Sequence, residues 1–305
     1  MTGLALVALF VFGLCVGSFG NVVIWRVPKR DRETVSPEDA RAGRSLVEDV
    51  VAPHGDDDLV LAADEQVAEE VAEDHRTSQS VVKPGSYCPG CGSTLHWFDN
   101  VPLMSWIALR GRCRHCDAHI PVRYPLVELS TAVLWVLVGL RFGLSWSTPV
   151  YLVLAWGLVV LSAIDLELYL LPNRIVYPLG YAIGALLLVA AAATGDWASL
   201  RTAALTAVVS FVAFFVMHFV FAGGMGFGDV RLSFVLGLAL GWLGWREAFL
   251  GFFLSFLLGA VIGIALIVFG KRGRKQAVPF GEFMAAGAMI AVLAGPAILS
   301  HYPAV

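Results

Sequence analysis

Apolar residues recur in eight long runs separated by short polar segments, and this pattern predicts helices that cross a membrane. A spanning helix needs about 20 predominantly apolar residues. The expected spans cover residues 4–23, 125–140, 148–165, 175–194, 202–222, 230–243, 246–269 and 281–298. The span at 230–243 is the shortest of them and contains glycines. The expected fold class is an all-α polytopic membrane protein with about eight transmembrane helices and a small cysteine-containing module outside the bilayer.

Composition agrees with this pattern. The chain is 58% hydrophobic and only 15% charged, and its mean hydropathy is +0.74. These values exclude an ordinary soluble domain. The net charge of −3 adds little. A lipid bilayer is therefore an expected partner, and nucleic acid is not.

The distribution of basic residues predicts the orientation in the membrane. No positive charge precedes the first apolar run, whereas Arg26, Lys29 and Arg30 follow it, so we interpret it as an uncleaved helix with its N-terminus outside. The basic residues expected on one side are Lys29, Arg30, Arg174, Arg231 and the cluster at 271–275, against Arg141, Arg201 and Arg246 on the other. The positive-inside rule then places Asp165, Asp229 and the segment 84–123 on the cytoplasmic side.

Four of the five cysteines form two C-x-x-C pairs. Cys88, Cys91, Cys113 and Cys116 provide four thiolates at a spacing typical of a closed tetrahedral zinc site, which is structural because it has no open position. A redox dithiol is the alternative, but it needs only one pair. Nearby His96, His115 and His119 are expected at the surface or beside the ligands, and Cys15 is expected to be a buried, inert thiol.

Two aspartates lie at the ends of predicted membrane helices. Asp229 follows a glycine-rich stretch, 223–228, and Asp165 ends an apolar run shortly before Leu171-Pro172. Carboxylates near a membrane interior are functional candidates, and two that are close can share a proton and activate water. The alternative is that both are interfacial charges. Two further acids have ordinary explanations: Glu128 suits the start of a helix, and Glu167 is expected to face water or headgroups.

Several separate motifs resemble the prepilin peptidases, also called type IV leader peptidases. Residues 226–229 look like the GxGD signature of intramembrane aspartyl proteases. The other matching motifs are Gly17-Ser18-Phe19-x-Asn21 through Pro28, the double C-x-x-C, Asn100-Val101-Pro102 with Ser105-Trp106, Arg110-Gly111-Arg112-Cys113, Arg123-Tyr124-Pro125 with Glu128, Asp165 with Leu171-Pro172, and Pro279-Phe280-Gly281. Together they cover nearly the whole chain except an acidic insertion.

The resemblance implies an enzyme of two activities in the bacterial inner membrane. Asp165 and Asp229 would be the catalytic pair that removes the basic leader from type IV prepilins and pseudopilins at the cytoplasmic face. The four cysteines would hold zinc, and S-adenosylmethionine would serve N-methylation of the new N-terminus. The implied division is 1–28, the first helix and its motif; 29–83, an acidic and disordered insertion; 84–123, the zinc module and methyltransferase part; and 124–305, the peptidase core.

Some alternatives remain open from sequence. Arg231, Asn173 and Glu282 stand where many family members have Lys, Asp and Pro, which affects the expected substrate preference more than the chemistry. A proton- or cation-coupled transporter using the same aspartates would require inverted repeats, and a zinc protease would require an open metal site. The S-adenosylmethionine site is expected near the zinc module and residues 17–28, unless that module only braces the helices.

Overall fold

The computed structural model describes residues 2–33, 87–88, 90–220, 226–268 and 280–301, and helices make up most of them. Within these ranges there is no β-strand, and two isolated antiparallel β-bridges lie in the cysteine module. The helices are α1 Gly3–Glu33, η1 Trp97–Asn100, α4 Met104–Ala108, α5 Arg123–Phe142, α6 Thr148–Leu168, α7 Asn173–Thr194, α8 Trp197–Val220, α9 Phe227–Leu243, α10 Trp245–Val268 and α11 Gly281–Ser300. The predicted fold class is confirmed.

Seven helices of the described part are long and apolar enough to cross a membrane: α1, α5, α6, α7, α8, α10 and α11. The eighth predicted span is α9, a helix of 17 residues. At about 1.5 Å per residue it extends about 25 Å, the short end of the spanning range. It also packs tightly on α8, because a Cβ at Gly237 would lie only 2.2 Å from Ser210 Oγ. Helix α9 is therefore an interior helix of the bundle.

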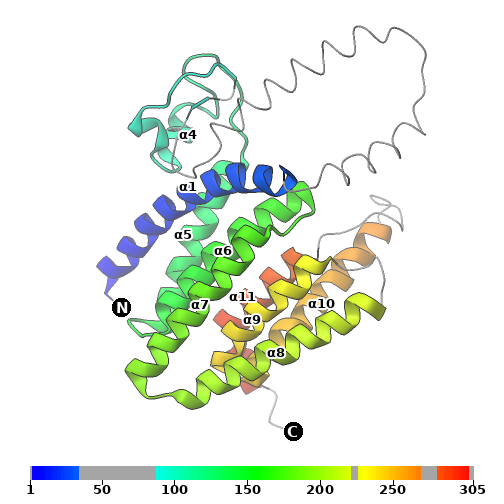
Figure 1. Cartoon of the computed structure of the whole chain (residues 1–305). Coiled ribbons are helices and arrows are strands. Elements are labelled where there is room, and N and C mark those ends of the chain that lie inside the picture. The colour runs from blue at the N-terminus through cyan, green and yellow to red at the C-terminus, as the bar shows by residue number, and fades with distance from the viewer. Residues whose placement is uncertain (1, 34–86, 89, 221–225, 269–279, 302–305) are drawn as a thin grey trace, which may run out of the picture.

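Helix α1 extends about ten residues beyond the predicted span and contains Pro28 within it. Its continuation is stabilised by packing, because Val23, Ile24 and Val27 are buried against the bundle. Small residues bring α1 close to α5: a Cβ added to Gly17 would lie 2.7 Å from Glu128 Cα. Figure 1 shows α1 crossing over the ends of α5 and α6. Close approach through glycine is a common device of membrane helices.

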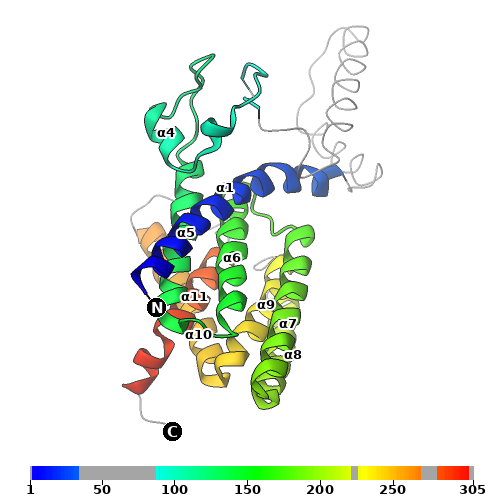
Figure 2. The same cartoon turned by 90° about the vertical axis from the view of Figure 1, so that its left-hand side faces the viewer.

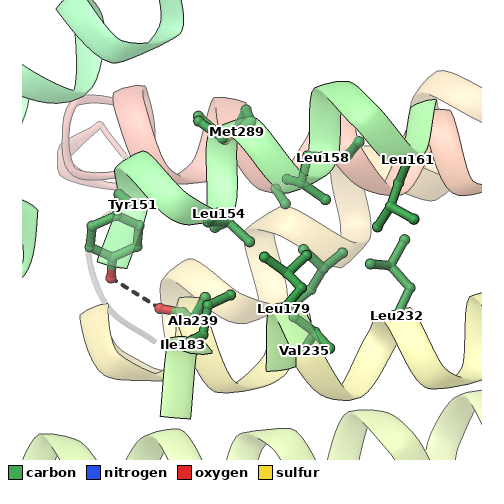
Figure 3. Packing of buried hydrophobic residues seen from close by; sticks show 14 of the residues in the cluster. Tyr151, Leu154, Leu158, Leu161, Leu179, Ile183, Leu232, Val235, Ala239 and Met289 are labelled. Carbon is green, nitrogen blue, oxygen red and sulfur yellow. Dashed lines mark hydrogen bonds between the residues drawn. The ribbon is translucent and has the colours of Figure 1, made fainter. Parts of the chain in front are cut away.

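The remaining helices form closely packed pairs around α6. Helix α8 packs on α9 and α10 on α11, while α6 contacts α5, α7 and α11 (Figure 2). Leucines of α6 meet α7 and α9 in a largely apolar layer (Figure 3). The Tyr151 hydroxyl in that layer donates a hydrogen bond of 3.0 Å to the Ala239 carbonyl. This pairing satisfies a hydroxyl that would otherwise be buried without a partner.

Three expectations from sequence need comment at this level. Most of the acidic insertion at 29–83 and the basic cluster at 271–275 lie outside the described residues. Cys15 was expected to be buried, which is wrong: it lies on the outward surface of α1. The reason is that the glycines at positions 13, 17 and 20 occupy the packed face of α1, so position 15 points away from α5.

Candidate active site and metal centre

Asp165 lies in the last turn of α6 and is 5% exposed. The helix ends four residues later, where Tyr169 adopts a left-handed conformation (φ 52°) and its N–H donates to the Asp165 carbonyl at 2.9 Å. Pro172 then precedes the first residue of α7. This sharp turn between two membrane helices leaves the Asp165 side chain inside the bundle at its end.

Asp229 lies in the first turn of α9 and is 6% exposed. Gly226 occupies the N-cap, and its carbonyl accepts the Asp229 N–H at 3.1 Å. The glycine-rich sequence before α9 thus delivers an acid to a buried helix N-terminus.

The two aspartates are brought together where α6, α9 and α11 meet. Asp229 lies within electrostatic reach of Asp165. Gly281, the first residue of α11, lies against the other side of Asp165, since a Cβ there would be 2.7 Å from Asp165 Oδ2. That oxygen is buried and makes no hydrogen bond of normal geometry among the described residues, although the Gly281 N–H lies near the carboxylate. An unpaired carboxylate oxygen beside a second carboxylate is an arrangement that can hold a water molecule or share a proton.

Leu171 packs between the first turns of α9 and α11, beside the two acids. A Cβ at Gly228 would lie 2.9 Å from Leu171 Cβ, and one at Gly281 would lie 3.2 Å from Leu171 Cδ1. The Leu171 side chain therefore occupies space that is free only because positions 228 and 281 are glycines. The sequence pattern pointed to Leu171-Pro172 only as a stop for the preceding helix and to Gly281 only as part of a motif, so neither side chain was expected to shape the site. A leucine and a glycine carry no reactive group, so their steric role at this site could not be recognised from the sequence.

Glu167 is two residues from Asp165 but belongs to a different contact. Its carboxylate accepts a hydrogen bond from the Arg123 guanidinium at the start of α5, and its side chain is 48% exposed. The expectation that Glu167 lies near water is consistent with this exposure. The ion pair joins the beginning of α5 to the end of α6 beside the aspartates.

Arg231 and Asn173 contact each other. The Arg231 guanidinium donates to Asn173 Oδ1 and lies 4.5 Å from the centroid of the Phe227 ring. The contact joins the first residue of α7 to the beginning of α9. An amide at position 173 accepts this hydrogen bond as an aspartate would, but it carries no negative charge.

The four predicted metal ligands are brought together by the structure. The sulfur atoms of Cys88, Cys91, Cys113 and Cys116 all lie within 4.8 Å of one another. The Cys88 and Cys116 sulfurs are 3.7 Å apart. Zinc–sulfur bonds of about 2.3 Å in a tetrahedron require sulfur atoms about 3.8 Å apart. The four thiols therefore fit a metal ion of this size.

The two C-x-x-C segments have the same backbone structure. In residues 88–93 and 113–118 the first cysteine N–H donates to the carbonyl five residues later, at 2.9 Å and 2.8 Å. The residue after the second cysteine has positive φ in both, 69° at Gly92 and 61° at Asp117. Matching turns of this kind point two pairs of thiols at one centre, as metal-binding knuckles do. A lone redox dithiol does not explain the second turn.

The surroundings favour the thiolate form of two of the four thiols, whereas burial and the neighbouring thiols raise the pKa of Cys116 to about 12. Hydrogen bonds to Ser93 lower the pKa of Cys91 to about 6, and the backbone N–H groups of His115 and Cys116 lower the pKa of Cys113. The metal-binding form of cysteine is the thiolate.

The three neighbouring histidines, His96, His115 and His119, are exposed, as expected. Within the described residues, none of them joins the metal cluster.

Glu128 was interpreted as an acid that suits the start of a helix, and this is wrong. It lies beyond the first turn of α5 and is 7% exposed. Its Oε2 accepts the Leu103 N–H from the cysteine module at 2.8 Å. The interpretation failed because the sequence does not show that α1 and the module both cover this part of α5.

Comparison with known protein families accounts for both halves of the chain. The bacterial peptidase A24 N-terminal domain matches residues 11–142, which include α1, the cysteine module and α5. The type IV leader peptidase family matches residues 152–264, which include both aspartates. No solved structure matches the chain.

Individual relatives agree over almost the full length. The prepilin leader peptidase/N-methyltransferase of Aeromonas salmonicida is 34% identical over 299 residues, covering 96% of this chain and 92% of the relative. The proteins of the same name from Stutzerimonas stutzeri and Pseudomonas aeruginosa are also 34% identical, over 96% of this chain and 91% of each relative. The resemblance predicted from sequence motifs is confirmed, and the chain belongs to the type IV leader peptidase family.

Proposed function

We propose that this protein removes the basic leader from type IV prepilins or pseudopilins, with Asp165 and Asp229 as its catalytic pair. The observation that carries the proposal is the meeting of these two buried carboxylates at the ends of α6 and α9, beside an unpaired oxygen of Asp165. Membership of the leader peptidase family supports the substrate class.

The pair acts as an acid and a base on one water molecule. Two close, buried carboxyl groups do not both ionise readily, so they share a proton. The ionised partner takes a proton from water as the water oxygen adds to the scissile carbonyl, and the protonated partner gives its proton to the carbonyl oxygen. Collapse of the tetrahedral intermediate breaks the C–N bond: the first partner gives its proton to the leaving amine, and the second partner takes back a proton from a hydroxyl of the intermediate.

The active site faces the cytoplasm in this proposal. Asp165 and Asp229 lie at the same end of the bundle as Arg123, Arg174 and Arg231, which the positive-inside rule assigns to the cytoplasm of a bacterial inner membrane. Figures 1 and 2 place the cysteine module beyond that end. The leader of a prepilin is cytoplasmic, whereas its apolar helix is in the bilayer, so the scissile bond reaches the helix ends where the aspartates lie.

N-methylation with S-adenosylmethionine is the proposed second activity, as the names of the relatives suggest. Zinc bound by Cys88, Cys91, Cys113 and Cys116 would hold the module folded, since a closed four-thiolate site leaves no position for substrate. We retain the division into 1–28, 29–83, 84–123 and 124–305, with methyl transfer at the first and third parts. Cys88→Ser should then impair methylation more than cleavage.

A coupled transporter finds no support in the geometry. Its ion-binding acids are expected near the middle of the bilayer on broken helices. Here, Asp165 is in the last turn of α6 and Asp229 is in the first turn of α9. Both acids are therefore at one membrane face.

The decisive experiment uses purified variants and a full-length prepilin. Asp165→Asn and Asp229→Asn are each expected to abolish leader cleavage, because an amide neither takes nor gives the shared proton. Glu167→Gln is the matched control, since it alters an acid two residues away that pairs with Arg123. Asp229→Asn should still methylate a leaderless pilin. Normal cleavage by either aspartate variant would overturn the assignment.

A further inference from the structure

Glu128 is a buried carboxylate that the proposed hydrolysis does not use. Its carboxylate faces the middle of α1, where the side chains of Ser18 and Asn21 lie within hydrogen-bonding reach of it. The third donor is the Leu103 N–H of the cysteine module, at 2.8 Å. All three donors are neutral, so the carboxylate is buried without the full positive charge that normally accompanies such a group.

Asn21 adds an unused acceptor to the same place. It is 3% exposed, and its Nδ2 donates to the Tyr124 carbonyl at 3.1 Å. Its Oδ1 is buried and has no partner among the described residues. Rotating the amide would not remove the mismatch, because the oxygen would then face the Tyr124 carbonyl. The Asn21 oxygen therefore requires a donor that does not come from the described part of the chain.

The backbone that covers these two residues is strained. Leu103 has φ 59° and ψ −48°, outside the regions that a non-glycine residue ordinarily occupies. Such a conformation persists where its surroundings hold it, and it is often found at binding sites. Here the strained residue is the one whose N–H binds Glu128.

The acceptor pair is close to the peptidase helices. Glu128 is on α5, which packs against α6, and Arg123 at the start of α5 forms an ion pair with Glu167. Glu167 is two residues beyond Asp165. Figure 2 shows α1, α5 and the module meeting above the bundle at this end. An N-terminus formed at the aspartates therefore reaches Glu128 by moving along one membrane face.

We propose that Glu128 and Asn21 bind a primary ammonium group during methyl transfer, an assignment that rests on the proposed function above. An ammonium group supplies both the N–H donors that Asn21 Oδ1 lacks and the positive charge that Glu128 lacks. A divalent cation fits less well, because it requires six or more oxygen ligands. Two sources carry this chemistry: the new N-terminus of the cleaved pilin and the α-ammonium of S-adenosylmethionine.

If the bound ammonium group is the pilin N-terminus, Glu128 also acts as the base that deprotonates it for methyl transfer. It takes one proton from the ammonium, and the freed amine attacks the sulfonium methyl group of S-adenosylmethionine. The new C–N bond forms as the C–S bond breaks, and the bonding electrons stay on sulfur. The products are a methylammonium N-terminus, S-adenosylhomocysteine and a protonated Glu128, which releases its proton to solvent.

The test measures cleavage and methylation separately, by mass spectrometry of intact and leaderless pilin. Glu128→Gln is expected to reduce methyl transfer to leaderless pilin about 100-fold, the scale of one acid–base group, with leader cleavage unchanged. Asn21→Leu, which keeps a similar shape without the acceptor, should reduce methylation in the same direction. Glu247→Gln, in the first turn of α10, is the control acid.

Measuring S-adenosylmethionine binding by calorimetry distinguishes whether the bound ammonium group belongs to the pilin N-terminus or to the cofactor. If Glu128 holds the pilin N-terminus, Glu128→Gln binds S-adenosylmethionine as wild type does, and the KM for leaderless pilin changes. If it holds the cofactor, the same variant binds S-adenosylmethionine as weakly as wild type binds an analogue without the α-amine. Either result supports the ammonium site.

Three outcomes would overturn the proposal. Wild-type methylation by both Glu128→Gln and Asn21→Leu would show that neither acceptor is needed. Loss of cleavage and methylation in equal proportion would show that the cluster only braces the module. A wild-type enzyme that cleaves but transfers no methyl group would refute the methylation part of the proposed function together with this site, leaving the aspartate assignment intact.

Discussion

Replacing Gly281 by Ala tests the aspartate site without changing a charged or polar group. A Cβ at this position would lie 2.7 Å from Asp165 Oδ2 and 3.2 Å from Leu171 Cδ1. Ordinary contact between carbon and oxygen needs about 3.4 Å, so the Asp165 carboxylate must move by about 0.7 Å. A displacement of about 1 Å at a reacting group costs up to about 100-fold in rate. We expect Gly281→Ala to cleave prepilin about 10- to 100-fold more slowly than wild type.

The backbone itself accepts alanine here. Gly281 is the first residue of α11 and does not have positive φ. Alanine is favoured over glycine in a helix by up to about 1 kcal/mol. The expected loss therefore comes from the contact with Asp165 and not from unfolding of α11.

The assay measures the rate of leader removal by purified variants at saturating prepilin, together with a melting temperature. Gly263→Ala on α10 is the matched control, because a Cβ there would meet nothing within 4 Å. If Gly281→Ala cleaves as fast as Gly263→Ala, Asp165 is not at the reacting centre. Methylation of leaderless pilin should remain near the wild-type rate in both variants.

Three other predictions concern metal, insertion and packing. Cys113→Ser should lose the single zinc ion expected per chain, and elemental analysis of pure wild-type protein without metal would contradict the four-thiolate site. Deleting residues 36–78 should leave cleavage largely unchanged, because this acidic segment lacks an apolar face; lost cleavage in a well-inserted deletion protein would mean that it binds substrate. Gly17→Leu should lower the melting temperature, since its Cβ alone would lie 2.7 Å from Glu128 Cα, whereas Gly3→Leu, which has open space, should not.

The membrane helices were largely predictable because their signal is local. Runs of apolar residues place α6 and α7 within about three residues of their observed ends. The end of α1 was not predictable in the same way. It depends on Val23, Ile24 and Val27 finding a buried surface on other helices, which overcomes the effect of Pro28.

Among the candidate site residues, too, those with a local signal were predictable, whereas those whose role depends on distant contacts were not. Asp165 and Asp229 were predicted as a pair because a carboxylate in an apolar chain is unusual, and the structure brings them together. The roles of Gly281 and Leu171 were missed because they arise only when α11 and α9 approach α6. Glu128 was seen but misinterpreted, since the contacts that bury it come from segments 25 and more than 100 residues away.

Helix α5 is the element that fixes the cysteine module relative to the aspartates. At its beginning, Arg123 binds Glu167 of α6. In its second turn, Glu128 binds Leu103 of the module, and between them the Tyr124 carbonyl accepts from Asn21 of α1. Three polar contacts within two turns therefore hold α1, the module and the peptidase helices to one another. One helix therefore carries the attachments of α1, the module and α6, and these contacts set the position of Glu128 relative to Asp165.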